Sequence, residues 1–109
     1  MSAPFVTQLR TRGSVIQMAA PGAPAVTVRV EVPEVWDVVS IAAAPDERVL
    51  AVKLRALAAL FPGVEEPHEA FVMKLRGFEV LDESVSLTTV GAVDGSIFLL
   101  THRRRRPVR

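Results

Sequence analysis

The sequence predicts a single α+β domain, in which a mixed sheet of four to five strands carries one main helix across a face. Segments with the two-residue apolar period of strands lie on both sides of one segment with the helical period. The chain has 109 residues, and compact domains usually hold about 100 to 150. Its composition, 50% hydrophobic and 23% charged, is typical of a chain that builds a globular core.

The first two strands are expected to form an antiparallel hairpin. Valine occupies every second position over residues 26–32, which is the strongest strand pattern in the sequence. Residues 33–35 interrupt this pattern, and a second strand is expected over 36–43. Two β-branched runs joined by so short a segment favour a hairpin.

The main helix is expected over residues 47–60. Asp46 is expected to cap its N-terminus, and Glu47 to complement the positive end of the helix dipole. Residues Pro62 and Gly63 stop it. The stripe expected to face the core comprises Leu50, Leu54, Leu57 and Phe61, widened by Val49 and Leu60, with Arg48, Lys53 and Arg55 mostly off it.

The second half of the chain predicts three more short elements. A third strand over 71–75 ends at the turn of Arg76 and Gly77, and a short fourth strand covers 78–81. A turn-rich or helical stretch then leads to the turn 94–96 and a last strand over 97–101. The residues expected in the core by pattern are Val28, Val30, Ile41, Leu57, Phe71, Met73, Phe98 and Leu100.

The net charge of +1 conceals a separation of charge along the chain. Residues 25–102 carry six basic and twelve acidic side chains, whereas residues 103–109 carry five arginines. The poorly patterned residues 1–24 end in an Ala/Pro-rich stretch and are expected to form a flexible N-terminal arm. A short extra strand from Phe5 and Val6 and from Val15–Met18 is the alternative. We therefore expect an acidic domain over 25–103 with a basic tail over 104–109.

Composition also bounds the setting of the protein. The sequence has no cysteine, which excludes disulfides, thiolate metal sites and a cysteine nucleophile. No segment has the roughly 18 apolar residues of a membrane span, and the N-terminus lacks the pattern of a secretory signal. A soluble, cytoplasmic protein without a membrane span is expected.

No group of residues predicts catalysis, a metal or a cofactor. The acidic segment 65–69 contains His68, but neighbouring residues in a proline loop rarely converge on one ion, so a solvated loop is expected. His102 is expected to be exposed at the end of the last strand. Ser96 precedes a strand rather than the helix of a nucleophile elbow, and Asp82 and Glu83 are neighbours in a turn that point apart.

Two features are candidates for binding. The arginines at 103–106 offer planar groups to paired oxygens, and the alternatives are a solvated tail, a contact with an acidic protein, or a contact with nucleic acid or anionic lipid. No aromatic residue interleaves them to stack bases. Trp36, beside Val35 near the hairpin tip, is either an interface residue or a partly buried core residue.

The order of the elements resembles the β-grasp fold of the ubiquitin family. The best match covers residues 86–100, where Leu87 is followed four residues later by Gly91, then by Asp-Gly-Ser at 94–96 and an apolar strand. Residues 74–82 resemble the family's preceding hairpin, and 45–52 resemble the start of its helix. The segments 36–41 and 94–100 resemble the bacterial YukD-like members, including those associated with type VII secretion.

The sequence departs from ubiquitin at two places. The positions that match the terminal diglycine hold Arg106 and Pro107, which cannot thread a narrow activating channel as glycine does. The positions that match the patch gripped by ubiquitin's partners are Lys74, Leu99 and Thr101, and only Leu99 is apolar. Conjugation of the chain as written and recognition by ordinary ubiquitin-binding modules are therefore not expected.

The resemblance implies a non-catalytic protein-binding module that acts as an adaptor or accessory subunit of a larger bacterial assembly, such as type VII-like secretion. One alternative is the precursor of a bacterial ubiquitin-like modifier, whose tail is trimmed before conjugation; a remoter one is a nucleic-acid-associated small protein. Neither a cofactor nor a metal is expected. The candidate interaction residues are Val35, Trp36, Lys74, Leu99, Thr101, Arg103, Arg104, Arg105 and Arg106.

Overall fold

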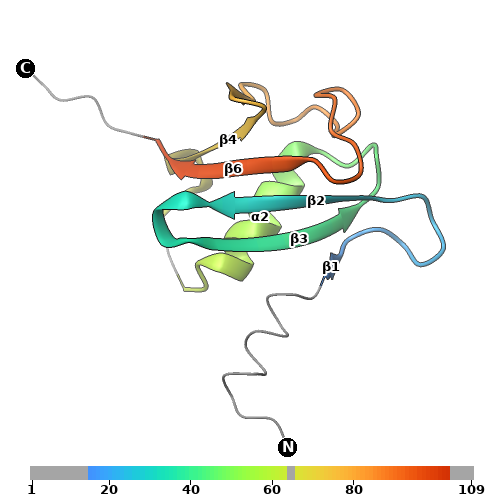
Figure 1. Ribbon diagram of the computed structural model, residues 1–109, viewed down its shortest axis with the longest axis horizontal. Helices are drawn as coiled ribbons and strands as arrows, with labels where there is room; N and C mark the ends of the chain where they lie inside the picture. Colours follow the sequence, from blue (N-terminus) through green and yellow to red (C-terminus); the bar gives the residue numbers. More distant parts are fainter. Residues whose placement is uncertain (1–14, 64–65, 104–109) are drawn as a thin grey trace, which may run out of the picture.

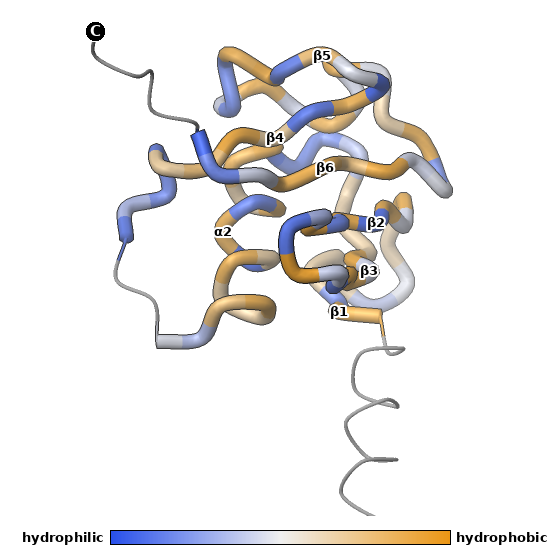
Figure 2. The backbone as a smooth tube through the Cα atoms, turned by 60° about the vertical axis from the view of Figure 1, so that its left-hand side comes forward, coloured by the Kyte–Doolittle hydropathy of each residue, from blue (hydrophilic) through white to orange (hydrophobic). Residues whose placement is uncertain are grey.

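The computed structural model describes residues 15–63 and 66–103 and has a six-stranded mixed sheet with one α-helix across it (Figure 1). The strand order is β1-β3-β2-β6-β4-β5. Figure 2 shows α2 on one side of the sheet. The elements are β1 (Val15–Gln17), β2 (Val26–Val32), the 3-10 turn η1 (Pro33–Val35), β3 (Asp37–Ala43), α2 (Val49–Leu60), the 3-10 turn η2 (His68–Ala70), β4 (Phe71–Leu75), β5 (Phe78–Glu79) and β6 (Ile97–His102).

The predicted hairpin is confirmed as β2 and β3. The two strands pair antiparallel along their whole lengths, from Val26 opposite Ala43 to Val32 opposite Asp37. Val28 and Val30 are fully buried on the helix side of β2, as their alternation predicts. The hairpin therefore supplies one half of the sheet and one wall of the core.

Strand β6 joins that hairpin to the second half of the chain. It runs parallel to β2, with Val30 opposite Phe98, and antiparallel to β4, with Met73 opposite Leu100. Neighbouring parallel strands need a long crossover connection, which α2 and the following segments provide. Phe98, Leu100 and Met73 are fully buried at the centre of the core.

The turn before β6 holds the two halves of the sheet in register. The carboxylate of Asp94 accepts a hydrogen bond of 2.7 Å from the backbone N–H of Thr27, and the N–H of Gly95 donates to the Thr27 carbonyl at 2.7 Å. Gly95 has a φ of 91°, a conformation that glycine adopts without steric cost. This geometry explains why an Asp-Gly pair directly precedes β6.

The predicted helix exists, but its start and its cap differ from the prediction. It begins at Val49, and neither Asp46 nor any other side chain caps it. Instead, the N–H groups of Val49 and Leu50, which have no partner within the helix, donate to the carbonyls of Val85 and Glu83 at 2.9 and 2.8 Å. Backbone groups from a distant loop thus satisfy the helix terminus, which a side chain would otherwise have to do.

The buried face of α2 also differs from the predicted stripe. Val49, Val52, Lys53 and Ala56 are buried, Leu54 is 46% exposed, and Leu57 lies partly buried at the core margin. The two stripes have the same helical period, so spacing alone does not distinguish them. The inner face carries Val49, Val52 and Ala56, whose small side chains let the helix approach the sheet closely. Lys53 can be buried there because Glu83, on the loop after β5, pairs with its ammonium.

The sheet has six strands rather than four to five, because Val15–Gln17 forms the short strand β1. This strand lies parallel to β3, with Ile16 opposite Ile41. The short extra strand predicted as an alternative at Val15–Met18 is therefore present. Residues 1–14 and the expected tail, residues 104–109, lie outside the described residues. The extent of the arm and of the tail therefore stays a prediction.

Along residues 15–63 and 66–103, no helix is long and apolar enough to cross a membrane.

Candidate functional site

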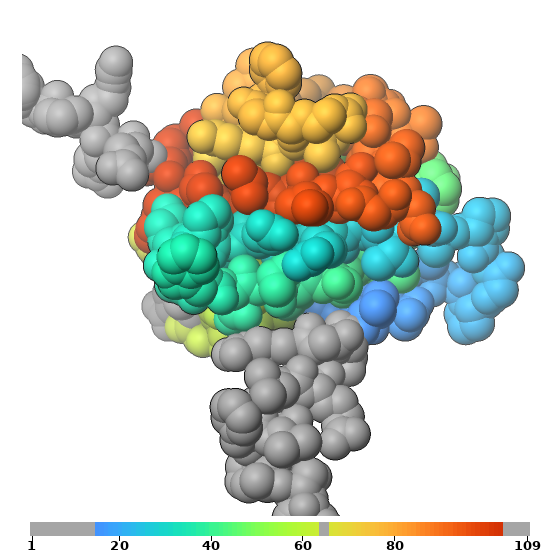
Figure 3. Space-filling view, in the orientation of Figure 1, coloured from blue at the N-terminus to red at the C-terminus, as the bar shows by residue number. Residues whose placement is uncertain are grey.

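The sheet face opposite α2, called the outer face here, carries three of the candidate binding residues, Lys74, Leu99 and Thr101. Figure 3 shows the molecule from this side. Successive side chains of a strand point to opposite faces, so the neighbours of the core residues point away from the helix. This alternation is visible in the burial of β2 and β6, whereas on β4 the outward-facing Val72 is itself buried. The outer face comprises Arg29 and Glu31 of β2, Val38 and Ser40 of β3, Val72 and Lys74 of β4, and Ile97, Leu99 and Thr101 of β6.

The strand register brings two of the predicted site residues together at the centre of this face. Leu99 is the partner of Glu31 on one side and of Lys74 on the other. Thr101 lies two residues further along β6, opposite Val72. An apolar side chain flanked by an acidic and a basic one offers both contact area and charge for orienting a partner.

Trp36 and Val35 lie at the end of the β2–β3 hairpin and are exposed. Trp36 is 94% exposed and Val35 51%, so the alternative of a partly buried tryptophan is wrong. The reason is local: Trp36 follows the 3-10 turn with a φ of 56°. This left-handed conformation takes it out of the alternation of the strands, and Pro33 is the only sequence signal for that turn.

A shallow hollow of about 270 Å³ connects Trp36 with the outer face. It is lined by Arg29, Glu31, Val32, Pro33, Trp36, Asp37 and Val38. The Arg29 guanidinium and the Glu31 carboxylate, two residues apart on β2, lie 3.6 Å from each other. The indole, Val38 and Pro33 supply apolar surface, while the charged groups mark the rim, which is the general composition of a protein-binding surface.

A second hollow of about 430 Å³ adjoins the first at Pro33, at the C-terminal end of β6, and includes the first arginine of the 103–106 run. It is lined by Pro33, Glu34, Val72, Lys74, Glu79, Thr101, His102 and Arg103. Arg103 folds back onto the sheet, where it donates to the Glu79 carboxylate at 3.3 Å and to the Glu69 carbonyl at 3.2 Å. Arg104, Arg105 and Arg106 lie outside the described residues.

The sequence did not reveal an internal ion pair beneath α2. Lys53 is only 1% exposed, and its ammonium donates to both carboxylate oxygens of Glu83 at 2.9 and 3.0 Å. His68 Nδ1 lies 3.4 Å from the same nitrogen, so the expected solvated loop is in part folded onto the helix. No spacing in the sequence connects these three residues. Lys53 is the buried member, and the partly exposed Glu83 and His68 close over its ammonium, so the cluster ties η2 and the loop after β5 to α2.

The other candidate catalytic or metal-binding residues, His102, Asp82 and Ser96, each contact neighbouring groups and not one another. His102 is exposed at the end of β6, stacks on Phe71 at 4.4 Å between ring centres and lies 2.9 Å from the Glu66 carboxylate. Hydrogen bonds from the hydroxyl and the N–H of Ser84 lower the pKa of Asp82. Ser96 Oγ accepts from the N–H of Val93 at 2.8 Å. Within residues 15–63 and 66–103, no three acidic or histidine side chains are grouped to hold a metal ion.

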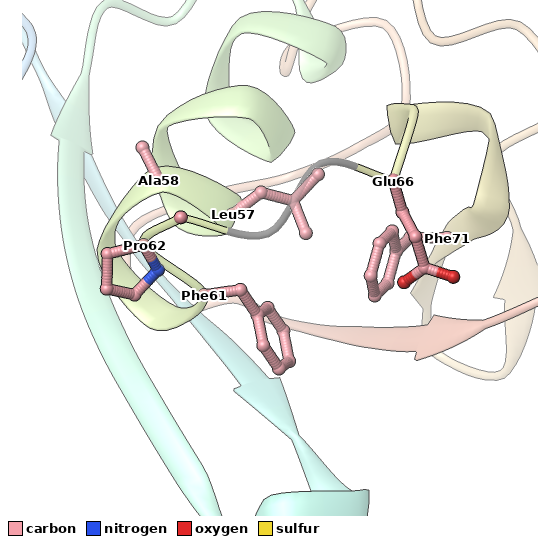
Figure 4. Close-up of a pocket in the computed structure, with 7 residues that line it drawn as sticks. Leu57, Ala58, Phe61, Pro62, Glu66 and Phe71 are labelled. Carbon is pink, nitrogen blue, oxygen red and sulfur yellow. The ribbon is translucent and has the colours of Figure 1, made fainter.

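A third hollow, of about 450 Å³, opens at the C-terminal end of α2 (Figure 4). Leu57 and Ala58 face it from the helix, and the rings of Phe61 and Phe71 line it with centres 5.6 Å apart. Glu66 supplies its carboxylate, which already contacts His102. The hollow is therefore apolar, with one charged group that has a partner.

Comparison with solved structures identifies the fold. A ubiquitin-like domain of Arabidopsis thaliana superposes with a TM-score of 0.63 at 14% identity, over 84% of this chain and 92% of that domain. Caldiarchaeum subterraneum ubiquitin gives 0.63 at 19% identity, over 77% and 100%. The UBL domain of Plasmodium falciparum Dsk2 gives 0.60 at 26% identity, over 73% and 100%. Neither a family model nor a curated protein matches the chain.

The chain therefore has the ubiquitin-like β-grasp fold, and its described part contains one main helix and a mixed sheet of six strands. This confirms the fold expected from the sequence resemblance.

Proposed function

We propose that this chain is a non-catalytic protein-binding module, which holds its partner against the outer face and Trp36. The observation that carries the proposal is the 94% exposed tryptophan at the rim of a hollow that continues onto the outer face. Tryptophan is over-represented among the residues that dominate binding energy. Val35, which is 51% exposed, extends this apolar surface next to the indole, and the hollow continues it onto the outer face.

The composition of the outer face supports a partner that is a protein. Leu99, Val38 and Ile97 provide apolar area, and Glu31 and Lys74 provide opposite charges beside Leu99. Protein interfaces combine such an apolar centre with a polar rim. The structural neighbours include several ubiquitin-like domains, and such domains are typically non-catalytic modules, although a shared fold alone does not assign a role.

Composition and sequence resemblance indicate a biological setting for this module. A lack of cysteine fits a reducing compartment such as the cytoplasm. The resemblance of residues 36–41 and 94–100 to YukD-like segments supports an adaptor or accessory subunit of a bacterial assembly, with type VII-like secretion as the specific candidate. Arg103 and the arginines that follow it would then contact an acidic part of the same assembly.

Affinity capture from extract of the host, quantified by mass spectrometry, tests the proposal. Trp36→Gly removes the indole and suits the left-handed backbone at this position. Leu81→Ser is the matched control, because Leu81 is 86% exposed and lines a different hollow. We expect Trp36→Gly to weaken the same partner's binding by about thirtyfold, the effect of losing about 2 kcal/mol.

Equal recovery of the partner by the wild type and Trp36→Gly would contradict the proposal. A loss with Leu81→Ser but not with Trp36→Gly would contradict it as well, because binding would then depend on the hollow beside β5.

A further inference from the structure

Strand β1 is attached to the fold at the edge of the sheet. It comprises only Val15–Gln17 and pairs parallel with Ser40–Ala42, three of the seven residues of β3. Figure 1 shows it beside the end of β3, at the edge opposite β4. The chain reaches it from the N-terminal side and leaves it through a segment rich in alanine and proline. β1 is thus an added strand rather than part of the central pairing.

Two partly buried side chains and two backbone hydrogen bonds just after the strand hold β1 against the sheet. Ile16 lies opposite Ile41 and, with Met18, packs partly buried against the core. Val15 and Gln17 are exposed. The N–H groups of Met18 and Ala19 both donate to the carbonyl of Ala42, at 2.8 and 3.1 Å.

The fully buried core is built without β1. All its members lie between Val28 and Leu100, on β2, β3, α2, β4, β6 and the loop before β6. Detaching β1 would therefore leave the core in place and expose the backbone edge of β3. A sheet edge is a template on which an extended chain can pair.

We propose that the edge of β3 is a strand-acceptor site, which β1 occupies in the free protein and an extended segment of a partner protein occupies in a complex. The seated strand defines the chemistry of that segment. It runs parallel to β3, has a branched apolar residue at the position of Ile16 and a second apolar residue at the position of Met18, and tolerates a polar residue between them. This site is separate from the outer face and does not rest on the function proposed above.

The connection to β2 sets how strongly β1 competes with such a partner. Residues 19–25 form a short link with a turn, in which the N–H of Ala23 donates to the carbonyl of Ala20 at 3.0 Å and Gly22 has a φ of 78°. A short tether holds a segment at an effective concentration on the order of 1 mM. A free strand therefore binds weakly until β1 is released.

The test uses the full chain and a fluorescent synthetic peptide with the sequence of residues 13–20. Ile16→Asp places a charge on the inward side of β1 and should release it, whereas Val15→Asp makes the same change at an exposed position. Met18→Pro is a second releasing variant, because it removes the N–H that donates to Ala42. Fluorescence anisotropy measures peptide affinity, and circular dichroism confirms folding.

We expect Ile16→Asp and Met18→Pro to bind the peptide at least about tenfold more tightly than the wild type and Val15→Asp. In the wild type, most molecules have β1 on the edge of β3, which lowers the apparent affinity for the peptide, and the releasing variants remove this competition. A peptide carrying the same Ile-to-Asp change should not bind, and Trp36→Gly should bind like the wild type. This last arm separates the strand site from the outer face.

Four results would overturn the proposal. In the first, the releasing variants fold but bind the peptide no better than the wild type. In the second, the altered peptide binds equally well. In the third, both releasing variants unfold, which makes β1 integral to the fold. In the fourth, light scattering shows a wild-type dimer that Ile16→Asp and Met18→Pro convert to a monomer, which assigns the site to a second copy of this chain.

Discussion

Lys53 illustrates at the residue scale how a charge is accommodated in the core of a small domain. Its ammonium is removed from water and compensated by both oxygens of Glu83, with His68 beside it. Burying a charge without such a partner is strongly unfavourable. The pair ties α2 to the loop after β5, and that loop in turn caps the helix through the carbonyls of Glu83 and Val85.

Lys53→Ala should lower the free energy of unfolding by about 3 to 5 kcal/mol, because it leaves the Glu83 carboxylate poorly solvated and without its cation. Lys53→Met should cost less, since it fills the same space. Arg55→Ala, on the exposed side of the same helix, should change stability by less than about 0.5 kcal/mol. Denaturation in urea measures all three, and equal effects for Lys53→Ala and Arg55→Ala would refute the role of the pair.

Asp82 provides a prediction about pH. The Ser84 hydroxyl and N–H stabilise its charged form and lower its pKa in the folded chain, so its contribution to stability is present above the usual carboxyl pKa and is lost as the pH falls through the lowered value. Ser84→Ala should raise the pKa toward 3.8. An NMR titration of the Asp82 carboxyl carbon measures it, and an unchanged pKa would contradict the assigned cause.

At the scale of elements, periodicity predicts the strands well and the helix only in part. The alternation of valines defines β2, and β4 has its predicted bounds. For α2, the position of the element follows from spacing, but its rotation depends on Lys53 finding Glu83 thirty residues away. The cap depends on loop carbonyls rather than Asp46. A local sequence pattern carries no information on contacts between distant segments. The rotation of α2 and its N-terminal cap therefore could not be predicted.

The tip of the β2–β3 hairpin gives a prediction about backbone strain. Trp36 has a φ of 56° and almost no buried surface. Trp36→Gly should therefore keep the stability of the fold or raise it, within about 1 kcal/mol, because glycine adopts this conformation without a steric penalty. Glu31→Gly, inside β2, should destabilise instead. A fall in melting temperature for Trp36→Gly beyond that for Glu31→Gly would show that the indole supports the core.

At the scale of the whole molecule, the sequence predicts the architecture better than the candidate site. The order of strands and helix was sufficient to identify the ubiquitin-like fold, which structural neighbours confirm at low sequence identity. The resemblance locates Lys74 and Leu99 on the sheet, where they are cross-strand partners, and their role in binding stays a prediction. The hollow beside Trp36 could not be predicted, because it depends on the left-handed turn after Pro33 and on side chains from both strands.

The modifier alternative makes a different prediction for the chain in its host. Under the binding-module proposal, the protein isolated from its host carries no isopeptide-linked adducts and keeps the arginines after Arg103. Intact-mass spectrometry together with peptide mapping of residues 98–109 checks both points. A shortened C-terminus, or a ladder of adducts on other proteins, would support the modifier instead.

NMR cross-saturation from the captured partner to the labelled chain is the most direct test of the central claim, that this ubiquitin-like domain binds protein through its outer face. We predict that signal loss is concentrated at Trp36, Leu99, Lys74 and Thr101, which lie on or beside that face. Signal loss concentrated instead on the exposed residues of α2, such as Leu54 and Arg55, would contradict the claim.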